Sequence, residues 1–320
     1  MGKAPLVVRN LVRNKLKRPS SPPLQAISQA LLGAHPKGIL GLVFYGSCLH
    51  SGFKKGDSIA DIYVVVEGYH SFYGSIIPAI FNYLLPPNVY YMEVPYGDDI
   101  LRLKYAVISM NQLKRATFPL WFHSYFWARF SQPMQLIYYK DERVLEELTR
   151  CICSAMFTFV SRVIPCLWPN LAVARLWQRG LELTYMAELR PEGRERARLI
   201  WEKNKRYFED VTPPILENVC GKGWNIKKAD TDKHYLVEVK NYRFLACSLP
   251  WALRIGAGKI LSLFRLLKAT FTFAGGVDYA LWKIERHSGV RIKLGPFLRR
   301  HPILAMFVAS WRLIRKKAVR

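Results

Sequence analysis

Two apolar, strand-like runs joined through a Gly-Ser turn constrain the fold of this chain more than any other feature. Gly38 to Phe44 and Ala60 to Val66 are rich in β-branched and apolar residues, and Tyr45-Gly46-Ser47 follows the first run. A strand that enters such a turn leaves backbone N–H groups free to hold phosphate oxygens. Asp61, fourteen residues after Ser47, can hold Mg²⁺ against the same phosphates. The pattern is typical of sites for nucleotidyl transfer.

The second strand departs from the usual pattern for that chemistry. It reads Asp61-Ile62-Tyr63, so the second acid of an acid-apolar-acid strand is missing. Attack on an α-phosphate usually requires two or three carboxylates around one or two metal ions. A second ligand is therefore expected from elsewhere in the chain, and the candidates are Asp57, Glu93 and Glu188.

Periodicity divides the chain into four segments and predicts an α+β fold. Residues 1–35 form a basic leader and a short helix, and residues 36–145 form a mixed sheet with helices, to which Val89 to Val94 and Arg102 to Ser109 supply two further strands. Residues 146–250 are predicted to form a helical or winged-helix domain, with a helix stop at Pro213-Pro214 and a hairpin over Tyr235 to Phe244. Residues 251–320 form a basic, amphipathic C-terminal segment.

Charge and cysteine content narrow the classes of partner. The formal net charge of +25 favours a polyanion: nucleic acid, a nucleotide or anionic lipid. The six cysteines form no CxxC pair, so neither zinc nor a disulfide framework is expected, and a reducing compartment is the simpler interpretation. No run reaches the roughly 20 apolar residues of a membrane span. The acid-free N-terminus is also compatible with a mitochondrial transit peptide.

The ordered set of motifs resembles one family. FYGSCLHSGF, ADIYVVVEGYH, NVYYMEV, RLKYAVIS and WARFSQP occur in the order, and at spacing similar to that, of the mitochondrial-type, soluble phosphatidate cytidylyltransferases, which belong to the polymerase-beta-like nucleotidyltransferase superfamily. LELTYMAELRPE and ATFTFAGGVDYALWKIERH extend the resemblance over about residues 40–290. The family also lacks the second acid of the superfamily strand. This chain differs from it in a shorter segment between Asp61 and Val89, in Ala128 without a following Gly, in Gln132 in place of Lys and in Glu188 in place of Asp.

The resemblance implies a function and a set of site residues. Such an enzyme makes CDP-diacylglycerol and pyrophosphate from CTP and phosphatidic acid, with Mg²⁺ as cofactor. The implied roles are catalysis and metal binding for Asp61 and Glu188, nucleotide binding for Tyr45, Gly46, Ser47, Lys104 and Tyr185, and binding of phosphate or the lipid headgroup for Arg190 and Lys268.

The expected surroundings follow from the substrates. Phosphatidic acid lies in a bilayer, so the basic C-terminal segment is expected to dock the protein on an anionic membrane surface. That surface would be the cytoplasmic face of a bacterial inner membrane or the matrix side of the mitochondrial inner membrane. No obligate nucleic acid and no zinc are expected. Two alternatives stay open: a nucleotidyltransferase that acts on an RNA end or a small acceptor, and a degenerate, non-catalytic lipid-binding module.

Overall fold

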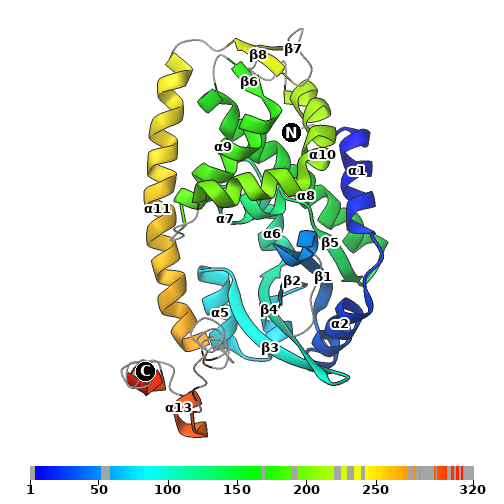
Figure 1. Ribbon diagram of the computed structural model, residues 1–320, viewed down its shortest axis with the longest axis vertical. Coiled ribbons are helices and arrows are strands. Elements are labelled where there is room, and N and C mark those ends of the chain that lie inside the picture. The colour runs from blue at the N-terminus through cyan, green and yellow to red at the C-terminus, as the bar shows by residue number, and fades with distance from the viewer. Residues whose placement is uncertain are drawn as a thin grey trace, which may run out of the picture.

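A computed structural model describes most of the chain. The described residues are 4–51, 58–167, 170–188, 193–219, 225–228, 234–238 and 242–272, with isolated positions and short runs between 277 and 312. They form an α+β structure with a mixed five-stranded sheet and a smaller three-stranded sheet (Figure 1).

The larger sheet contains the four strands that the sequence predicts. Its order is β3-β4-β2-β1-β5, with β2 parallel to β4 and the other neighbours antiparallel. The edge strand β5 was not predicted. The bounds are β1 Ile39–Tyr45, β2 Ile59–Val66, β3 Asn88–Tyr96, β4 Asp99–Ser109 and β5 Gln135–Tyr139.

Helices cover both faces of this sheet because alternate residues of its central strands are apolar on both sides. Ile62 and Val64 of β2 pack in one cluster with α2 and α4, whereas Tyr63 and Val65 pack in the other with α6, α7 and α8. Both faces of the strand are buried, as expected for a parallel pair. The bounds are α2 Pro22–Ala34, α3 Cys48–Ser51, α4 Tyr69–Tyr73, α5 Ile76–Leu84, α6 Met110–Thr117, α7 Ser124–Phe130 and α8 Glu142–Val163.

The basic leader is part of the folded core. It forms α1 (Leu6–Leu16), whose Val8, Val12 and Leu16 are buried against α8 and α10. Arg13 donates a hydrogen bond of 2.6 Å to Glu142 of α8, and Arg9 pairs with Glu146 of the same helix. The helix therefore attaches through apolar packing on one side and ion pairs on the other.

The second half of the chain continues the same hydrophobic core across residue 145. It contains a 3₁₀ turn (Ile164–Leu167), β6 Asn170–Ala172, α9 Val173–Met186, α10 Gly193–Val219, β7 Asn225–Lys228 and β8 His234–Glu238. Helix α8 ends at Val163, and Pro165 lies in the 3₁₀ turn that follows. The predicted stop at Pro213-Pro214 is wrong, since α10 passes through both prolines, and Tyr242 already lies in the next helix rather than in a hairpin.

The first part of the basic C-terminal segment is a long helix, α11 (Tyr242–Thr272), that lies along the molecule beside α9, α7 and β3 (Figure 1). Trp251, Arg254 and Lys268 are buried on its inner side. Beyond it, α13 (Pro296–Arg300) is described, and most of residues 302–315, on which part of the docking prediction falls, lie outside the described residues.

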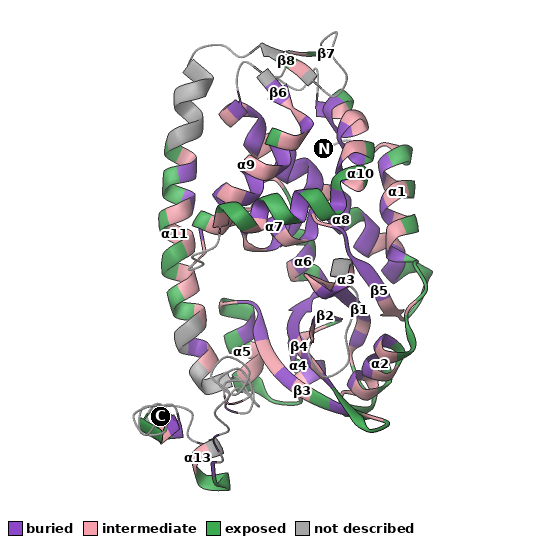
Figure 2. Ribbon diagram, in the orientation of Figure 1, coloured by how far each residue is buried: buried purple, intermediate pink, exposed green. Residues whose placement is uncertain are grey.

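Two findings bear on the expectations drawn from composition. By length and composition alone Glu142–Leu167 could cross a membrane, but 67% of its most apolar window is buried inside the protein, as in a core helix (Figure 2). Cys166 is disulfide-bonded, whereas Cys48, Cys151 and Cys153 are free, so the expectation of no disulfide does not hold for Cys166.

Candidate nucleotide site

The Gly-Ser turn and Asp61 meet at one edge of the sheet. Tyr45, the last residue of β1, is the register partner of Asp61 in β2, so the turn that follows lies directly beside the Asp61 carboxylate. Gly46 has φ +87°, and a Cβ added to it would lie 2.8 Å from Oδ2 of Asp61. Only glycine combines this backbone conformation with such close approach, which explains the residue type at this position.

These residues open into a cavity of about 110 Å³. Five of the predicted site residues line it: Tyr45, Gly46, Ser47, Asp61 and Tyr185. Sequence reasoning had not assigned the rest of the wall, which comes from α7, the turn after it and α10, and consists of Arg129, Gln132, Arg196, Leu199, Ile200 and Lys203. Three cations and one carboxylate thus face a single space, a charge balance that suits a phosphate group with a bound divalent cation.

Arg129 is the most strongly held of the cations. Its guanidinium donates to Glu188 at 2.7 Å and to the backbone carbonyl of Tyr125 at 2.8 Å, and it lies 3.7 Å from the centre of the Tyr125 ring. Burial is the largest single influence and acts to lower the pKa of Arg129, but the Glu188 carboxylate and the nearby hydroxyls of Tyr125, Tyr63 and Tyr45 together hold that pKa above its usual value. Arg129 is therefore a fixed positive charge in the cavity wall.

Glu188, predicted as the second metal ligand, is the partner of that arginine. Its side chain is 12% exposed and that of Arg129 is 11% exposed, so the ion pair is largely removed from water. Among the described residues that line the cavity, Asp61 is the only carboxylate, and no group of three or more His, Cys, Asp or Glu side chains suited to a metal occurs in the described part of the chain. Metal binding by Glu188 stays a prediction. The ion pair with Arg129 would compete with it for the same carboxylate.

Glu93, another candidate for the second ligand, is not among the described residues that line this cavity. Glu93 accepts hydrogen bonds from Tyr91 at 2.7 Å and Arg102 at 3.2 Å on β3 and β4, away from the cavity-lining residues. Asp57 lies outside the described residues. A single carboxylate still fits Mg²⁺, which commonly takes one or two protein carboxylates and completes its shell with substrate phosphates and water.

Tyr63 occupies the position of the missing second acid. It is fully buried, and its ring stacks on Tyr45 with centroids 4.6 Å apart. Its hydroxyl has no hydrogen-bond partner within the described part of the structure. Burial raises the pKa of Tyr63 well above its usual value, so the residue stays neutral and supports the turn by packing.

Two other predicted residues, Lys104 and Lys268, are not among the residues that line the cavity. Lys104 of β4 pairs in register with Asp61, and so emerges on the same face of the sheet, but it is absent from the lining. Lys268 lies on the inner side of α11, where its Nζ donates to the carbonyl of Pro87 at 3.0 Å and to that of Leu85. Both contacts are to neutral backbone groups rather than to a site for phosphate. Arg190 falls outside the described residues.

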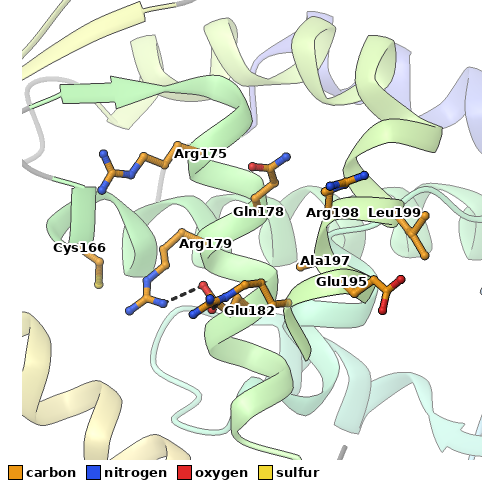
Figure 3. A pocket seen from close by; sticks show the side chains of 10 residues that line it. Cys166, Arg175, Gln178, Arg179, Glu182, Glu195, Ala197, Arg198 and Leu199 are labelled. Atoms are coloured by element: carbon orange, nitrogen blue, oxygen red, sulfur yellow. Dashed lines mark hydrogen bonds and ion pairs between the residues drawn. The ribbon is translucent and has the colours of Figure 1, made fainter. Parts of the chain in front are cut away.

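A second, larger cavity of about 880 Å³ lies between α9 and the first turns of α10 (Figure 3). Glu182 of α9 lies between two arginines, at 2.8 Å from Arg179 and 2.9 Å from Arg194. Burial acts to raise the pKa of Glu182, but the hydrogen bonds from these arginines lower it below its usual value. Leu199 contributes to both cavities.

Comparison with known proteins does not place this chain in a family. No family model matches its sequence, and no curated protein matches it. Among solved structures, a nucleotidyltransferase-like protein from Exiguobacterium sibiricum aligns over 92% of this chain and 91% of its own, with 12% sequence identity and a TM-score of 0.26. A TM-score this low does not establish a shared fold, so the functional assignment depends on the residues of the site.

Proposed function

We propose that this protein is a nucleotidyltransferase that transfers the cytidylyl group of CTP to phosphatidic acid and releases pyrophosphate. The observation that carries the proposal is the convergence, in one cavity, of the Gly46-Ser47 turn, the Asp61 carboxylate and the cations Arg129, Arg196 and Lys203. The choice of CTP and of a lipid acceptor comes from the sequence resemblance.

The cavity suits the phosphates of the substrate rather than the whole nucleotide. About 110 Å³ is well below the 300 to 1,000 Å³ of pockets that enclose a complete small molecule. In this proposal phosphate oxygens of CTP bind in the cavity, against backbone N–H groups of the turn and the three cations, and the rest of the nucleotide extends from its mouth. Tyr185, which also lines the cavity, offers an aromatic ring for contact with them.

Each group then has a defined task. The Gly46-Ser47 turn orients the triphosphate, and the fixed cation of Arg129 stabilises negative charge that develops on the phosphate oxygens. Asp61 would hold Mg²⁺, which polarises the α-phosphate when bound. An oxygen of the phosphatidate phosphate attacks the α-phosphorus, the bond to the bridging oxygen of the β-phosphate breaks, and pyrophosphate leaves.

The test is a transfer assay with purified full-length protein. Labelled CTP, Mg²⁺ and phosphatidic acid in mixed micelles are incubated with wild type, Asp61→Asn and the matched control Asp98→Asn, whose carboxylate is exposed in the turn between β3 and β4. We expect lipid-extractable label with wild type and Asp98→Asn and its loss with Asp61→Asn. If lipid label appeared only with another labelled nucleotide, that nucleotide would replace CTP as the proposed donor.

Two results would redirect the proposal. Label that appears on a short RNA oligonucleotide, but not on lipid, would assign an RNA end as the acceptor. Absence of transfer to either acceptor, in a protein that still binds the micelles, would assign a non-catalytic lipid-binding module. The structural reason would then be that Asp61 is the one carboxylate among the described residues of the cavity wall.

A further inference from the structure

Helix α5 exposes an unusual amount of apolar surface for a short helix in a folded protein. Within its nine residues, Asn82 alone is buried, and its amide donates to the Val107 carbonyl at 3.0 Å. Ile77 is 68% exposed and Leu84 is 71% exposed. The large apolar side chains that α5 turns to solvent are Ile76, Ile77, Ile80, Phe81, Tyr83 and Leu84.

Helix α11 adds a second exposed apolar stripe beside it. Arg265 donates to the carbonyl of Pro86 at 2.9 Å and Lys268 to that of Pro87 at 3.0 Å, so the residues just after α5 are bonded to α11 (Figure 1). Exposed and inward residues alternate along α11 (Figure 2). Its exposed apolar residues include Leu253, Ile260, Leu263 and Phe264. The exposed apolar residues of α5 and α11 are called the apolar face below.

The two segments that form the apolar face contain no acidic residue. Residues 68–92, which contain α5, and residues 239–277, which contain α11, include no Asp or Glu. Lys259 of α11 is exposed among its apolar neighbours. Large exposed apolar patches on proteins mark interaction sites, and apolar side chains combined with cations and no anions match a bilayer that carries anionic headgroups.

A chain of contacts links α11 to the candidate nucleotide site. The Arg265 guanidinium lies 4.1 Å from the centre of the Tyr125 ring, and Arg129 lies 3.7 Å from the centre of the same ring. Arg129 lines the cavity. Through Tyr125, α11 therefore contacts the wall of the site at which a lipid phosphate would react.

We propose that the apolar face of α5 and α11 seats this protein on an anionic lipid bilayer. The inference deepens the proposed function and rests on it for the choice of a lipid over an acidic protein as the partner. It also assigns docking to a surface that includes α5, which the sequence had not indicated, in addition to the basic C-terminal segment.

Vesicle flotation tests this proposal separately from catalysis. Full-length protein is mixed, without CTP, with vesicles of phosphatidylcholine alone or of phosphatidylcholine and phosphatidylglycerol, which contain no phosphatidic acid. The variants are Ile77→Glu on α5 and Leu263→Glu on α11, and the matched control is Leu6→Glu, which is 67% exposed on α1. Thermal melting confirms that each variant folds.

We expect wild type and Leu6→Glu to float with the anionic vesicles, and each face variant to bind them about tenfold more weakly or worse, as expected when one isoleucine or leucine is no longer buried. Raised salt should weaken wild-type binding. Wild-type binding by both face variants, or equal binding to neutral vesicles, would overturn the proposal. So would a wild-type dimer that does not float and that Ile77→Glu converts to a monomer, since a second copy would then cover the face.

Discussion

Replacing Gly46 with alanine tests the geometry of the candidate site most directly. At φ +87° an alanine costs about 1 to 2 kcal/mol relative to a right-handed conformation. Its Cβ would also lie 2.8 Å from Oδ2 of Asp61. Ordinary contact begins near 3.4 Å, so the carboxylate has to move by about 0.6 Å to relieve the overlap.

Gly74 provides a matched control for the backbone cost. Its φ is +63°, and no atom lies within 4 Å of a Cβ added there. Gly74→Ala therefore carries a similar conformational penalty and displaces nothing. The difference between the two variants isolates the displacement of Asp61 from the loss of backbone freedom.

Both variants should lower the melting temperature by several degrees, as expected for a loss of about 1 to 2 kcal/mol. In the CTP-dependent transfer assay, Gly46→Ala should lower kcat/KM by about 100-fold, because a catalytic group has been misplaced by a fraction of an ångström or more, whereas Gly74→Ala should stay near wild type. Equal activity of the two variants would refute the argument that Gly46 is there to admit the Asp61 carboxylate.

Three further predictions follow from buried or cavity-lining charges. Glu188→Gln should lower the free energy of unfolding, measured in urea, by about 3 kcal/mol, because it leaves Arg129 buried without its partner. If Glu188 acted only as a metal ligand, the same substitution would lower the affinity for Mg²⁺ with little effect on stability. Lys268 has its pKa lowered by burial, and secondarily by Arg265, from 10.5 to about 7. Between pH 7 and pH 10.5 Lys268 therefore keeps its proton in the unfolded chain but loses it in the folded protein. The free energy of unfolding should rise with pH over this range, by up to about 1.4 kcal/mol per pH unit. Lys268→Met should remove that slope. Arg196→Ala should raise the KM for CTP about tenfold, whereas Arg198→Ala, on the same helix but facing the larger cavity, should leave it unchanged; reversal of these two results would place the triphosphate in the larger cavity.

The strands around the site were predictable because their pattern is local. The apolar runs that became β1 and β2 have a register fixed by burial on both faces, and the Gly-Ser turn between them follows from the same residues. β5 was missed because its burial depends on pairing with β1, which lies about a hundred residues earlier.

The failures share a physical origin in tertiary packing. α10 passes Pro213-Pro214 because Ile215 and Leu216 beyond them are buried in the core, and such burial overrides local propensity. The same helix departs from helical dihedrals at Asn204, whose side chain donates to the Ile200 carbonyl at 2.8 Å and so satisfies a backbone acceptor at the kink.

The cavity wall shows the same limit on sequence reasoning. Tyr45, Gly46, Ser47 and Asp61 came from one motif, but Arg196 is separated from them by well over a hundred residues, and only the packing of α10 brings it near. Arg129 fell within a stretch that the resemblance had noted, although no role was assigned to it. Its pairing with Glu188 was not predicted, because nothing local to either residue indicates the other.

The position of α1 affects how this protein can be produced and recognised. A truncation at Pro19, made on the assumption that a basic leader is dispensable, would remove Val8, Val12 and Leu16 and leave an uncovered groove on α8, so insoluble material is the expected product. Arg9 and Arg13 of the leader are also paired with Glu146 and Glu142. A partner that bound these two arginines in the folded protein would therefore compete with their ion pairs.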